Sequence, residues 1–498
     1  MASPLVTPQN RDPDDEADFR FQTNGTACEW GESYHPGGYH PVILGDILQD
    51  RYRIIRKLGY GAFSTAWLAV DLHSNCFAAL KIAVANLDRE AADHTVTLYG
   101  SLPRGAAQHV IGLRDSFEVL GPNGRHLCLS LDPIGPHIST LLSQHAETHD
   151  RHLDPWDRRP RFPTPVTRRV LRDALLGLRV LHAHGIVHGD FHPGNILANI
   201  PPLGAPLTDA SLEAKLQQLP SQGSPLIRRD GKTDLWAPPY LLAPAPLHNQ
   251  QLSLELDPLV KITDLGAAFF ESSPPDKVVT PVALRAPEVI LHGNGDGGPL
   301  IGRGIDTWAF GCLVFELLSG RPLFVRLEGL DGDAEGDEQT NDEHLIQLSE
   351  VLGPLPAALA GRWRRRESYF APDGERLRIR ERGGDDDDDY MDDVVVGLEG
   401  DEDGNRDGDE DLEFDLEEDY EAMSPTSPSS DKSLSSSFWF ANVGRFAPLE
   451  DQLRENKPED MNDEEVEEVA KLIRWVLDYD TSKRPPVEAI LKNSWFSL

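Results

Sequence analysis

The spacing of apolar residues changes from two to three or four part-way along the chain. Between residues 51 and 84, apolar and polar side chains alternate around glycines, which is typical of half-buried β-strands. The strands that this pattern predicts cover residues 52–54, 65–69, 77–81 and 126–131. From Val166 to Leu181, apolar side chains recur every three or four positions, so we expect a helix that ends at Gly185. A small β-rich lobe thus precedes a large helical lobe, an α+β arrangement with its hinge at residues 132–134.

Two stretches interrupt this pattern, and we interpret both as insertions. The first covers residues from about 200 to 258 and is rich in proline and leucine. The second runs from about 371 to 437 and contains an acidic run and a serine tract. Residues 385–421 hold 21 acidic residues and one basic residue, or −20 of the total charge of −36. Such a segment buries too little apolar area to offset its ordering entropy, so we predict that the second insertion is disordered.

The two ends of the chain differ in character. Residues 1–38 are rich in proline, glycine and acidic side chains, so we predict a flexible N-terminal segment. Beyond the second insertion, Asn462 and Glu465 have the spacing of a helix capping box, followed by an apolar helical stripe. Regular helix is therefore expected to resume there.

Composition excludes several classes of protein. The four cysteines are scattered without Cys-x-x-Cys pairing, so neither a disulfide framework nor a zinc site is indicated. No apolar run is long enough to span a bilayer, and the polar N-terminus does not resemble a signal peptide. We therefore expect a monomer that lies in the cytoplasm, the nucleus or both and does not bind a membrane. The negative charge argues against direct nucleic-acid binding and favours basic partners.

Four short motifs carry candidate chemistry. They are, in order, Leu58-Gly59-Tyr60-Gly61-Ala62-Phe63-Ser64, then Ala79-Leu80-Lys81, then His188-Gly189-Asp190 with Asn195, then Asp264-Leu265-Gly266. In phosphoryl transfer from ATP, a glycine-rich turn approaches the phosphates and Lys81 would neutralise them. Asp190 would accept the proton of the substrate hydroxyl, and Asn195 and Asp264 would hold Mg²⁺. Each motif alone is weak, but their order and a later Ala286-Pro287-Glu288 indicate one site.

These motifs resemble those of SR-protein kinases, particularly the fungal ones, over residues 39–495 outside the insertions. Phe63-Ser64-Thr65 followed by Trp67 resembles this group, which has serine in place of a third glycine. Asp264-Leu265-Gly266, with leucine in place of phenylalanine, fits the same group. Residues 344–356 resemble the helical insert of the wider group that contains cyclin-dependent and MAP kinases.

The resemblance implies a bilobal protein kinase fold over residues 39–498, with an N-lobe at 52–135 and a C-lobe at 136–498. It also implies a serine/threonine kinase that uses ATP and Mg²⁺ and acts on Arg/Ser-rich proteins linked to mRNA splicing. Residues that would contact the nucleotide are Leu58, Gly59, Tyr60, Gly61, Ala62, Phe63, Ser64, Ala66, Lys81, Asp132 and Ile134. Asp306 would cap the catalytic-loop backbone, and Glu288 would pair with Arg484.

The chain also departs from the family pattern. Thr95 stands where the family has a helix glutamate that pairs with the ATP lysine, and Glu90 and Asp93 are the alternative partners. His192 stands where most protein kinases have lysine. In residues 280–285, the threonine and first arginine of the family are displaced or absent, and these elements normally orient the protein substrate.

Two alternatives follow from these departures. The segment from His188 to Asn195 resembles the catalytic loop of small-molecule phosphotransferases. Those enzymes lack the Ala-Pro-Glu segment, the aspartate at 306 and the arginine at 484, so the protein-kinase interpretation is preferred. The other alternative is a catalytically weakened kinase-like scaffold, which Thr95 and Pro281 favour and which Lys81, Asp190, Asn195 and Asp264 oppose.

Overall fold

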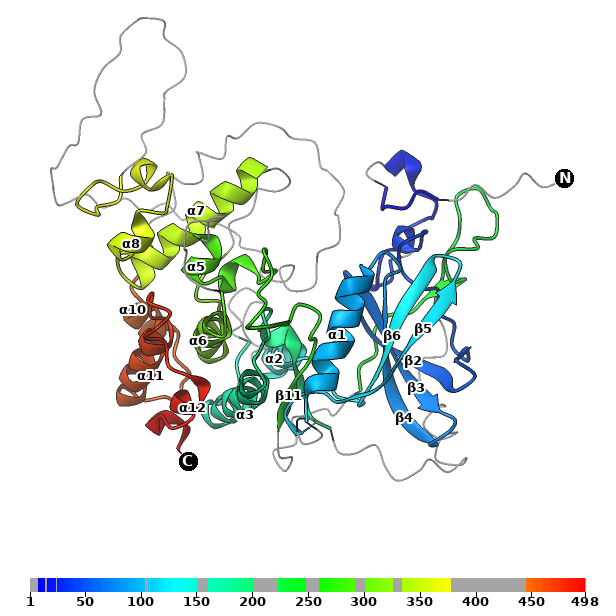
Figure 1. Ribbon diagram of the computed structural model, residues 1–498, viewed down its shortest axis with the longest axis horizontal. Helices are drawn as coiled ribbons and strands as arrows, with labels where there is room; N and C mark the ends of the chain where they lie inside the picture. The colour runs from blue at the N-terminus through cyan, green and yellow to red at the C-terminus, as the bar shows by residue number, and fades with distance from the viewer. Residues whose placement is uncertain are drawn as a thin grey trace, which may run out of the picture.

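The computed structural model describes residues 8–13, 16–23, 25–103, 106, 108–149, 160–200, 223–247, 259–291, 301–325, 334–377 and 445–497. These residues form a β-rich lobe and a helical lobe, seen on the right and left of Figure 1. The α+β, two-lobed fold expected from the sequence is confirmed. The acidic insertion lies outside the described residues from residue 378 onward. The limits assigned to the domain and its lobes stay predictions.

A six-stranded antiparallel sheet, in the order β1-β2-β3-β4-β6-β5, forms the N-lobe. Its strands are β1 (Ile47–Leu48), β2 (Tyr52–Gly61), β3 (Ser64–Asp71), β4 (Cys76–Ala83), β5 (Leu113–Gly121) and β6 (Gly124–Leu131). The four predicted strands lie within β2, β3, β4 and β6. Ile54, Trp67 and Leu80 share one buried apolar cluster, because alternate side chains of a strand point to the same face. Helix α1 (Arg89–Ser101) begins after Asp88, whose carboxylate accepts the N–H of Ala91.

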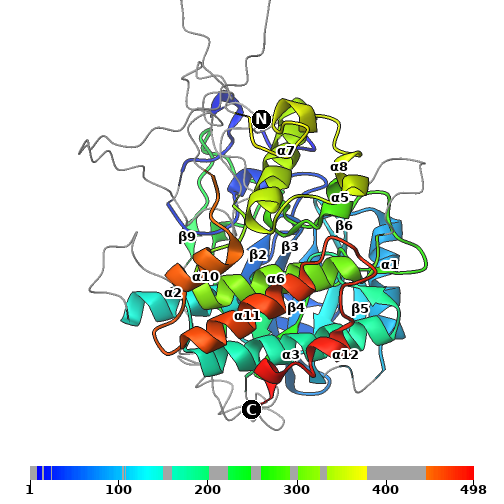
Figure 2. The ribbon, with the colours of Figure 1, turned by 90° about the vertical axis from the view of Figure 1, so that its left-hand side faces the viewer.

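The C-lobe is built around α6, whose side chains are buried on nearly every side. Its helices are α2 (Ile138–His149), α3 (Thr164–Ala183), α5 (Pro287–Ile290), α6 (Gly304–Ser319), α7 (Ala334–Val351), α8 (Ala357–Ala360), α10 (Leu449–Asn456), α11 (Asp463–Val476) and α12 (Val487–Ile490). Helices α3 and α11 pack against α6, as Figure 2 shows. Among the described helices, none is long and apolar enough to cross a membrane.

Two of the sequence predictions about helix ends are confirmed. Helix α3 contains the predicted apolar stripe, and Gly185 follows it with a φ of 67°, a left-handed conformation that favours glycine. Helix α11 begins at the capping box of Asn462 and Glu465, in which each side chain bonds the other's backbone N–H.

In the described part of the chain, three two-stranded ribbons accompany the main sheet. They are β7 (Ile186–Val187) with β12 (Phe269–Phe270), β8 (Ile196–Ala198) with β11 (Val260–Ile262), and β9 (Ser224–Pro225) with β10 (Tyr240–Leu241). The first two ribbons flank the loop of residues 188–195. They therefore hold this loop beside the segment that starts at Thr263.

The N-terminal segment differs from the flexible segment predicted up to residue 38. Phe21 and Tyr34 are only 5% and 1% exposed, and Arg20 forms an ion pair with Asp234 of the first insertion at 3.2 Å. The described part of that insertion, residues 223–247, contacts this segment and the N-lobe (Figure 1). Composition missed this layer because isolated aromatic residues in a polar segment bury only against distant strands.

A buried ion pair joins two distant parts of the C-lobe. The Arg484 guanidinium donates to both carboxylate oxygens of Glu288, at 2.5 and 2.8 Å, and both side chains are at most 2% exposed. Arg484 also donates to the carbonyls of Asp478 and Gly304. The pair expected from the sequence is therefore present, and it ties α5 to the segment before α12.

We predict that Glu288→Gln lowers the free energy of unfolding by about 3–5 kcal/mol, because it leaves a buried guanidinium without its counter-charge. The matched control is Glu271→Gln, in an ion pair with Arg303 whose side chains are 32% and 49% exposed. This control should change stability by no more than about 1 kcal/mol. Urea unfolding followed by circular dichroism measures both changes, and equal effects would contradict the structural role of the buried pair.

Candidate active site

The carboxylate of Asp306 anchors the loop of residues 188–195. The carboxylate of Asp306 accepts the backbone N–H groups of His188 and Gly189 at 2.8 and 2.9 Å, and it lies 2.8 Å from Nε2 of His182. Asp306 is 1% exposed, so these bonds form away from water and are correspondingly strong. The capping role expected of Asp306 is therefore present in the structure.

Asp190 and Asn195 lie together within this loop. The side-chain amide of Asn195 donates to the backbone carbonyl of Asp190 at 2.8 Å and to Oδ2 of its carboxylate at 3.1 Å. These bonds occupy the amide nitrogen of Asn195, which leaves its carbonyl oxygen to face another group. One short loop thus fixes a carboxylate and an amide oxygen with respect to each other.

His192 contributes to the charge state of Asp190. The N–H of Gly194 donates to Nδ1 of His192 at 3.1 Å, and Nε2 of the ring lies 3.0 Å from the amide nitrogen of Asn195 and 3.5 Å from Oδ2 of Asp190. Burial acts to raise the pKa of Asp190, but the hydrogen bond to His192 and the electrostatic interactions with the His192 and His188 rings together lower it more, so the net shift is downward. Asp190 is therefore ionised at neutral pH, as a proton acceptor must be.

Asp264 lies beside Asn195 because β8 and β11 pair. The N–H of Thr263 donates to the carbonyl of Asn195 at 3.0 Å, and Nε2 of His188 donates to the carbonyl of Thr263 at 2.9 Å. Asp264 itself has a φ of 62°, which is uncommon for a residue with a side chain and turns the chain sharply at this point.

Lys81 of β4 reaches Asp264 across the gap between the lobes. Its Nζ lies 2.6 Å from Oδ2 of Asp264. Burial acts to raise the pKa of Asp264, but the Lys81 ammonium and the N–H of Gly266 lower it to about 2. The structure therefore brings Lys81, Asp190, Asn195 and Asp264 into one cluster, although they come from both lobes.

The glycine-rich turn is the end of the hairpin formed by β2 and β3. Gly59 pairs with Ala66 and Gly61 pairs with Ser64, and the hairpin shifts register at Leu58. A Cβ placed on Gly59 or Gly61 would meet no atom within 4 Å, so open space adjoins the backbone of this turn. Tyr60, Ala62 and Phe63 complete the turn, and the side chain of Phe63 is 69% exposed.

The segment between β6 and α2 contains Asp132 and Ile134. The carboxylate of Asp132 accepts a hydrogen bond from Nε of Arg114 at 2.6 Å, and its N–H donates to the carbonyl of Gly112. Ile134 is buried, with 9% exposed. This segment joins the two lobes, as the sequence predicted for the hinge.

Helix α1 does not supply a carboxylate to Lys81. Glu90 and Asp93 are exposed, whereas Thr95 is 9% exposed and its hydroxyl donates to the carbonyl of Ala91. Within the described part of the chain, the ion pair of Lys81 is with Asp264, and neither acidic residue of α1 joins it. Thr95 therefore faces inward from α1, at the position that the sequence assigned to the family's glutamate.

Sequence reasoning missed one anchor of this loop. The hydroxyl of Thr280, which is 3% exposed, donates to the carbonyl of Gly189 at 2.5 Å. Nε of Arg285 donates in turn to the carbonyl of Thr280 at 2.8 Å. The sequence predicted that the family's threonine is displaced or absent in this segment, but the structure places Thr280 against the catalytic loop. Its contact depends on residues far apart in the chain, so no local pattern marks it.

The donor set of this cluster fits a complex of ATP with Mg²⁺. Carboxylate and amide oxygens, as offered by Asp264 and Asn195, are the ligands that Mg²⁺ prefers. The Lys81 ammonium provides a positive charge for phosphates, and the open space over Gly59 and Gly61 leaves room for them. These features suit phosphoryl transfer.

Comparison with known proteins agrees with this geometry. The family model of the protein kinase domain matches residues 52–496. Serine/threonine-protein kinase SRPK of Physarum polycephalum is 32% identical over 366 residues, or 71% of this chain and 79% of that protein. Protein kinase dsk1 of Schizosaccharomyces pombe is 26% identical over 70% of this chain and 75% of its own length. This chain belongs to the SR-protein kinases.

Other comparisons cover less sequence or show only the fold. Human SRSF protein kinase 3 is 34% identical over 173 residues, which are 33% of this SR-protein kinase and 28% of the human protein. A crystal structure of a kinase domain matches with a TM-score of 0.54 and 17% identity, covering 92% of this chain and 98% of the other. The resemblance to protein kinases seen in the sequence is therefore confirmed.

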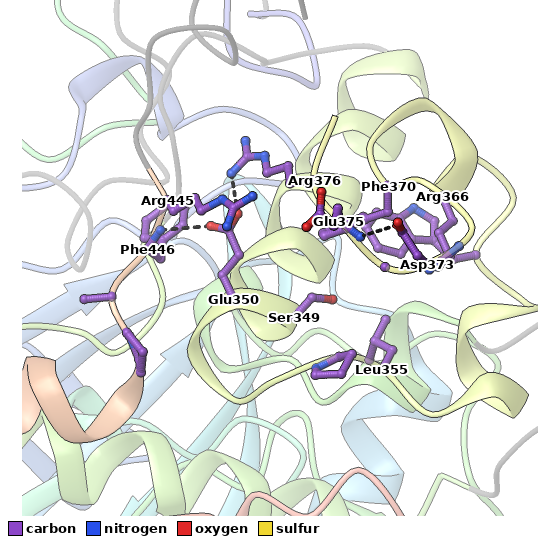
Figure 3. Close-up of a pocket in the computed structure, with 15 residues that line it drawn as sticks. Ser349, Glu350, Leu355, Arg366, Phe370, Asp373, Glu375, Arg376, Arg445 and Phe446 are labelled. Carbon is purple, nitrogen blue, oxygen red and sulfur yellow. Dashed lines mark hydrogen bonds and ion pairs between the residues drawn. The ribbon is translucent and has the colours of Figure 1, made fainter. Parts of the chain in front are cut away.

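A separate cavity of about 550 Å³ lies in the C-lobe of this kinase (Figure 3). Glu350 of α7 points into it and forms an ion pair with Arg376 at 2.7 Å, and it also accepts the N–H of Phe446 at 2.9 Å. The charged residues that line it are Glu350, Asp373, Glu375, Arg366, Arg376 and Arg445. Because these charges balance, the cavity does not favour either sign of partner.

We predict that Thr95→Glu raises the affinity of this kinase for ATP by about fivefold, or about 1 kcal/mol, because it adds a carboxylate at the inward-facing position of α1, where the family has the partner of the ATP lysine. Thr95→Gln is the control, since it has similar size and no charge. Glu90→Gln should have little effect, because Glu90 is exposed and unpaired with Lys81. Steady-state kinetics at varied ATP measures all three, and a loss of activity only in Glu90→Gln would contradict the assignment.

Proposed function

We propose that this SR-protein kinase transfers the γ-phosphate of ATP to serine or threonine of Arg/Ser-rich proteins linked to mRNA splicing. One observation carries the catalytic part of the proposal. The ionised Asp190 is held within one loop beside Asn195, and the Lys81–Asp264 ion pair lies next to that loop. An acceptor for a proton, two oxygen donors for a metal and a cation for phosphates are thus gathered in one place.

The proposed roles follow from the charges and contacts of these side chains. Lys81 neutralises phosphate oxygens, and Asn195 and Asp264 supply the oxygen donors that would hold Mg²⁺. The bound metal supplies electrostatic stabilisation of the charge on the transferred group. Asp190 accepts the proton of the substrate hydroxyl at its carboxylate, while Asn195 fixes the orientation of that carboxylate. The backbone of residues 132–134 would contact the adenine.

The substrate class rests on the relatives and on charge. The name of the human relative, SRSF protein kinase 3, gives a class of substrate for that protein. The net charge of −36 of this kinase would attract basic proteins and repel acidic ones over the range that salt leaves unscreened. These two observations support Arg/Ser-rich proteins over neutral or acidic ones.

A catalytically weakened scaffold is the second candidate, because α1 supplies no carboxylate to Lys81. The test is phosphate transfer from labelled ATP to an Arg/Ser-repeat peptide, with a Gly/Ser-repeat peptide of equal length as control. Transfer to the Arg/Ser peptide alone supports the proposal. Binding of ATP without transfer to either peptide would support the scaffold, and equal transfer to both would contradict the substrate class.

We predict that Asp190→Asn lowers the rate of transfer by about 10²–10⁴-fold and leaves ATP affinity nearly unchanged, because it removes the proton acceptor alone. Asp264→Asn should instead weaken the Mg²⁺-dependent part of nucleotide binding, since it removes a metal ligand and the partner of Lys81. Isothermal titration with ADP, with and without Mg²⁺, and single-turnover transfer distinguish the two variants. Equal loss of nucleotide affinity in both would contradict these roles.

A further inference from the structure

Residues 25–42, which we name the N-terminal strap, contact the glycine-rich hairpin directly. The hydroxyl of Tyr39 donates to the carbonyl of Gly61 at 2.9 Å. Burial raises the pKa of Tyr39 to about 12, so the hydroxyl keeps the proton that it donates. Gly61 is the second glycine of the turn to which the phosphates are assigned, so the strap contacts the proposed nucleotide site directly.

A buried ion pair makes a second contact between the strap and this hairpin. Glu29 of the strap binds the ammonium of Lys57 on β2, and the two residues are 3% and 2% exposed. The hydroxyl of Tyr34 donates to the same carboxylate at 2.5 Å. The ammonium of Lys57 also lies 5.4 Å from the centre of the Tyr60 ring, which belongs to the glycine-rich turn.

The strap also binds the linker that leads from β4 into α1. The N–H groups of Ala85 and Asn86 donate to the carbonyls of Gly38 and Gly37, at 3.0 and 2.8 Å. The N–H of Val84 in the same linker donates to the carbonyl of Phe63 at the tip of the hairpin. One short linker therefore connects the strap, the tip of the hairpin and the start of α1.

The fold of the strap itself depends on Gly38. A Cβ at Gly38 would lie 2.0 Å from the carbonyl oxygen of Ser33, so no other residue fits without movement of the backbone. The same region is fixed by the side-chain amide of Asn123, which donates to the carbonyl of Tyr39 at 2.6 Å and to that of Trp236 at 2.7 Å. The strap is thus fastened to the sheet and to the first insertion.

We propose that the N-terminal strap is a positioning element that holds the glycine-rich hairpin over the nucleotide through Tyr39 and Glu29. The proposal rests on the proposed function, because it assigns the nucleotide to this turn. Open space adjoins Gly59 and Gly61, so contacts such as the hydrogen bond from Tyr39 to Gly61 restrict how far the hairpin moves. Because α1 provides no carboxylate to Lys81, the position of the hairpin depends more strongly on its contacts with Tyr39 and Glu29 of the strap.

The decisive variant is Tyr39→Phe, which removes one hydroxyl and keeps the aromatic ring. We expect it to raise the dissociation constant of a fluorescent ADP analogue by about two- to tenfold, the range that corresponds to one net hydrogen bond, mainly through faster release. The matched control is Tyr240→Phe, because the hydroxyl of Tyr240 accepts the N–H of Leu44 at 3.0 Å and does not bond the glycine-rich hairpin. The control should leave ADP binding unchanged.

Amide hydrogen exchange of the full chain provides a readout that needs no nucleotide. Exchange of peptides from residues 52–71 should rise in Tyr39→Phe and in the double variant Glu29→Gln/Lys57→Met, which removes both buried charges together. It should not rise in Tyr240→Phe. Unchanged exchange and ADP release in Tyr39→Phe, or equal changes in Tyr39→Phe and Tyr240→Phe, would overturn the strap as a positioning element. Wild-type protein that does not bind ADP would contradict the proposed function, while the exchange result would still decide the role of the strap.

Discussion

The buried carboxylate of Asp306 is the interaction on which the arrangement of the site depends. It accepts two consecutive backbone N–H groups, those of His188 and Gly189, and a ring nitrogen of His182. Because α6 is buried on nearly every side, this carboxylate has a fixed place at the centre of the C-lobe. The catalytic loop is therefore attached to a helix buried in the C-lobe core, as a site that must hold its geometry requires.

From that anchor, the remaining groups of the site are placed by backbone pairing. Strands β8 and β11 set Asn195 beside Thr263, and the hydroxyl of Thr280 donates to the carbonyl of Gly189 in the same loop. The N-lobe adds Lys81 from β4, and the Lys81–Asp264 ion pair joins the two lobes in the absence of a carboxylate from α1. The positive charge of Lys81 in the N-lobe is thus paired with the carboxylate of Asp264 in the C-lobe.

The N-terminal segment and residues 223–247, which pack against the N-lobe, are also held in place by buried contacts. Buried aromatic residues and the ion pair of Glu29 with Lys57 attach a polar segment to strands that follow it in sequence. Separating this pair would leave a charge without its partner in a buried environment, which disfavours arrangements in which the segment is detached. The N-terminal segment and the first insertion therefore form a structural part of the lobe.

The sequence by itself determined the two lobes, the strands of the hairpin, the helix ends at Gly185 and Asn462, and the four motifs of the site. These follow from local periodicity, capping and short spacings, which act between residues near in the chain. The tertiary structure alone decided that Asp264, and not Glu90 or Asp93, pairs with Lys81, that Thr280 bonds Gly189, and that the N-terminal segment covers the sheet. Each of these contacts joins residues that are distant in sequence, so it exists only once the chain has brought its strands and helices together.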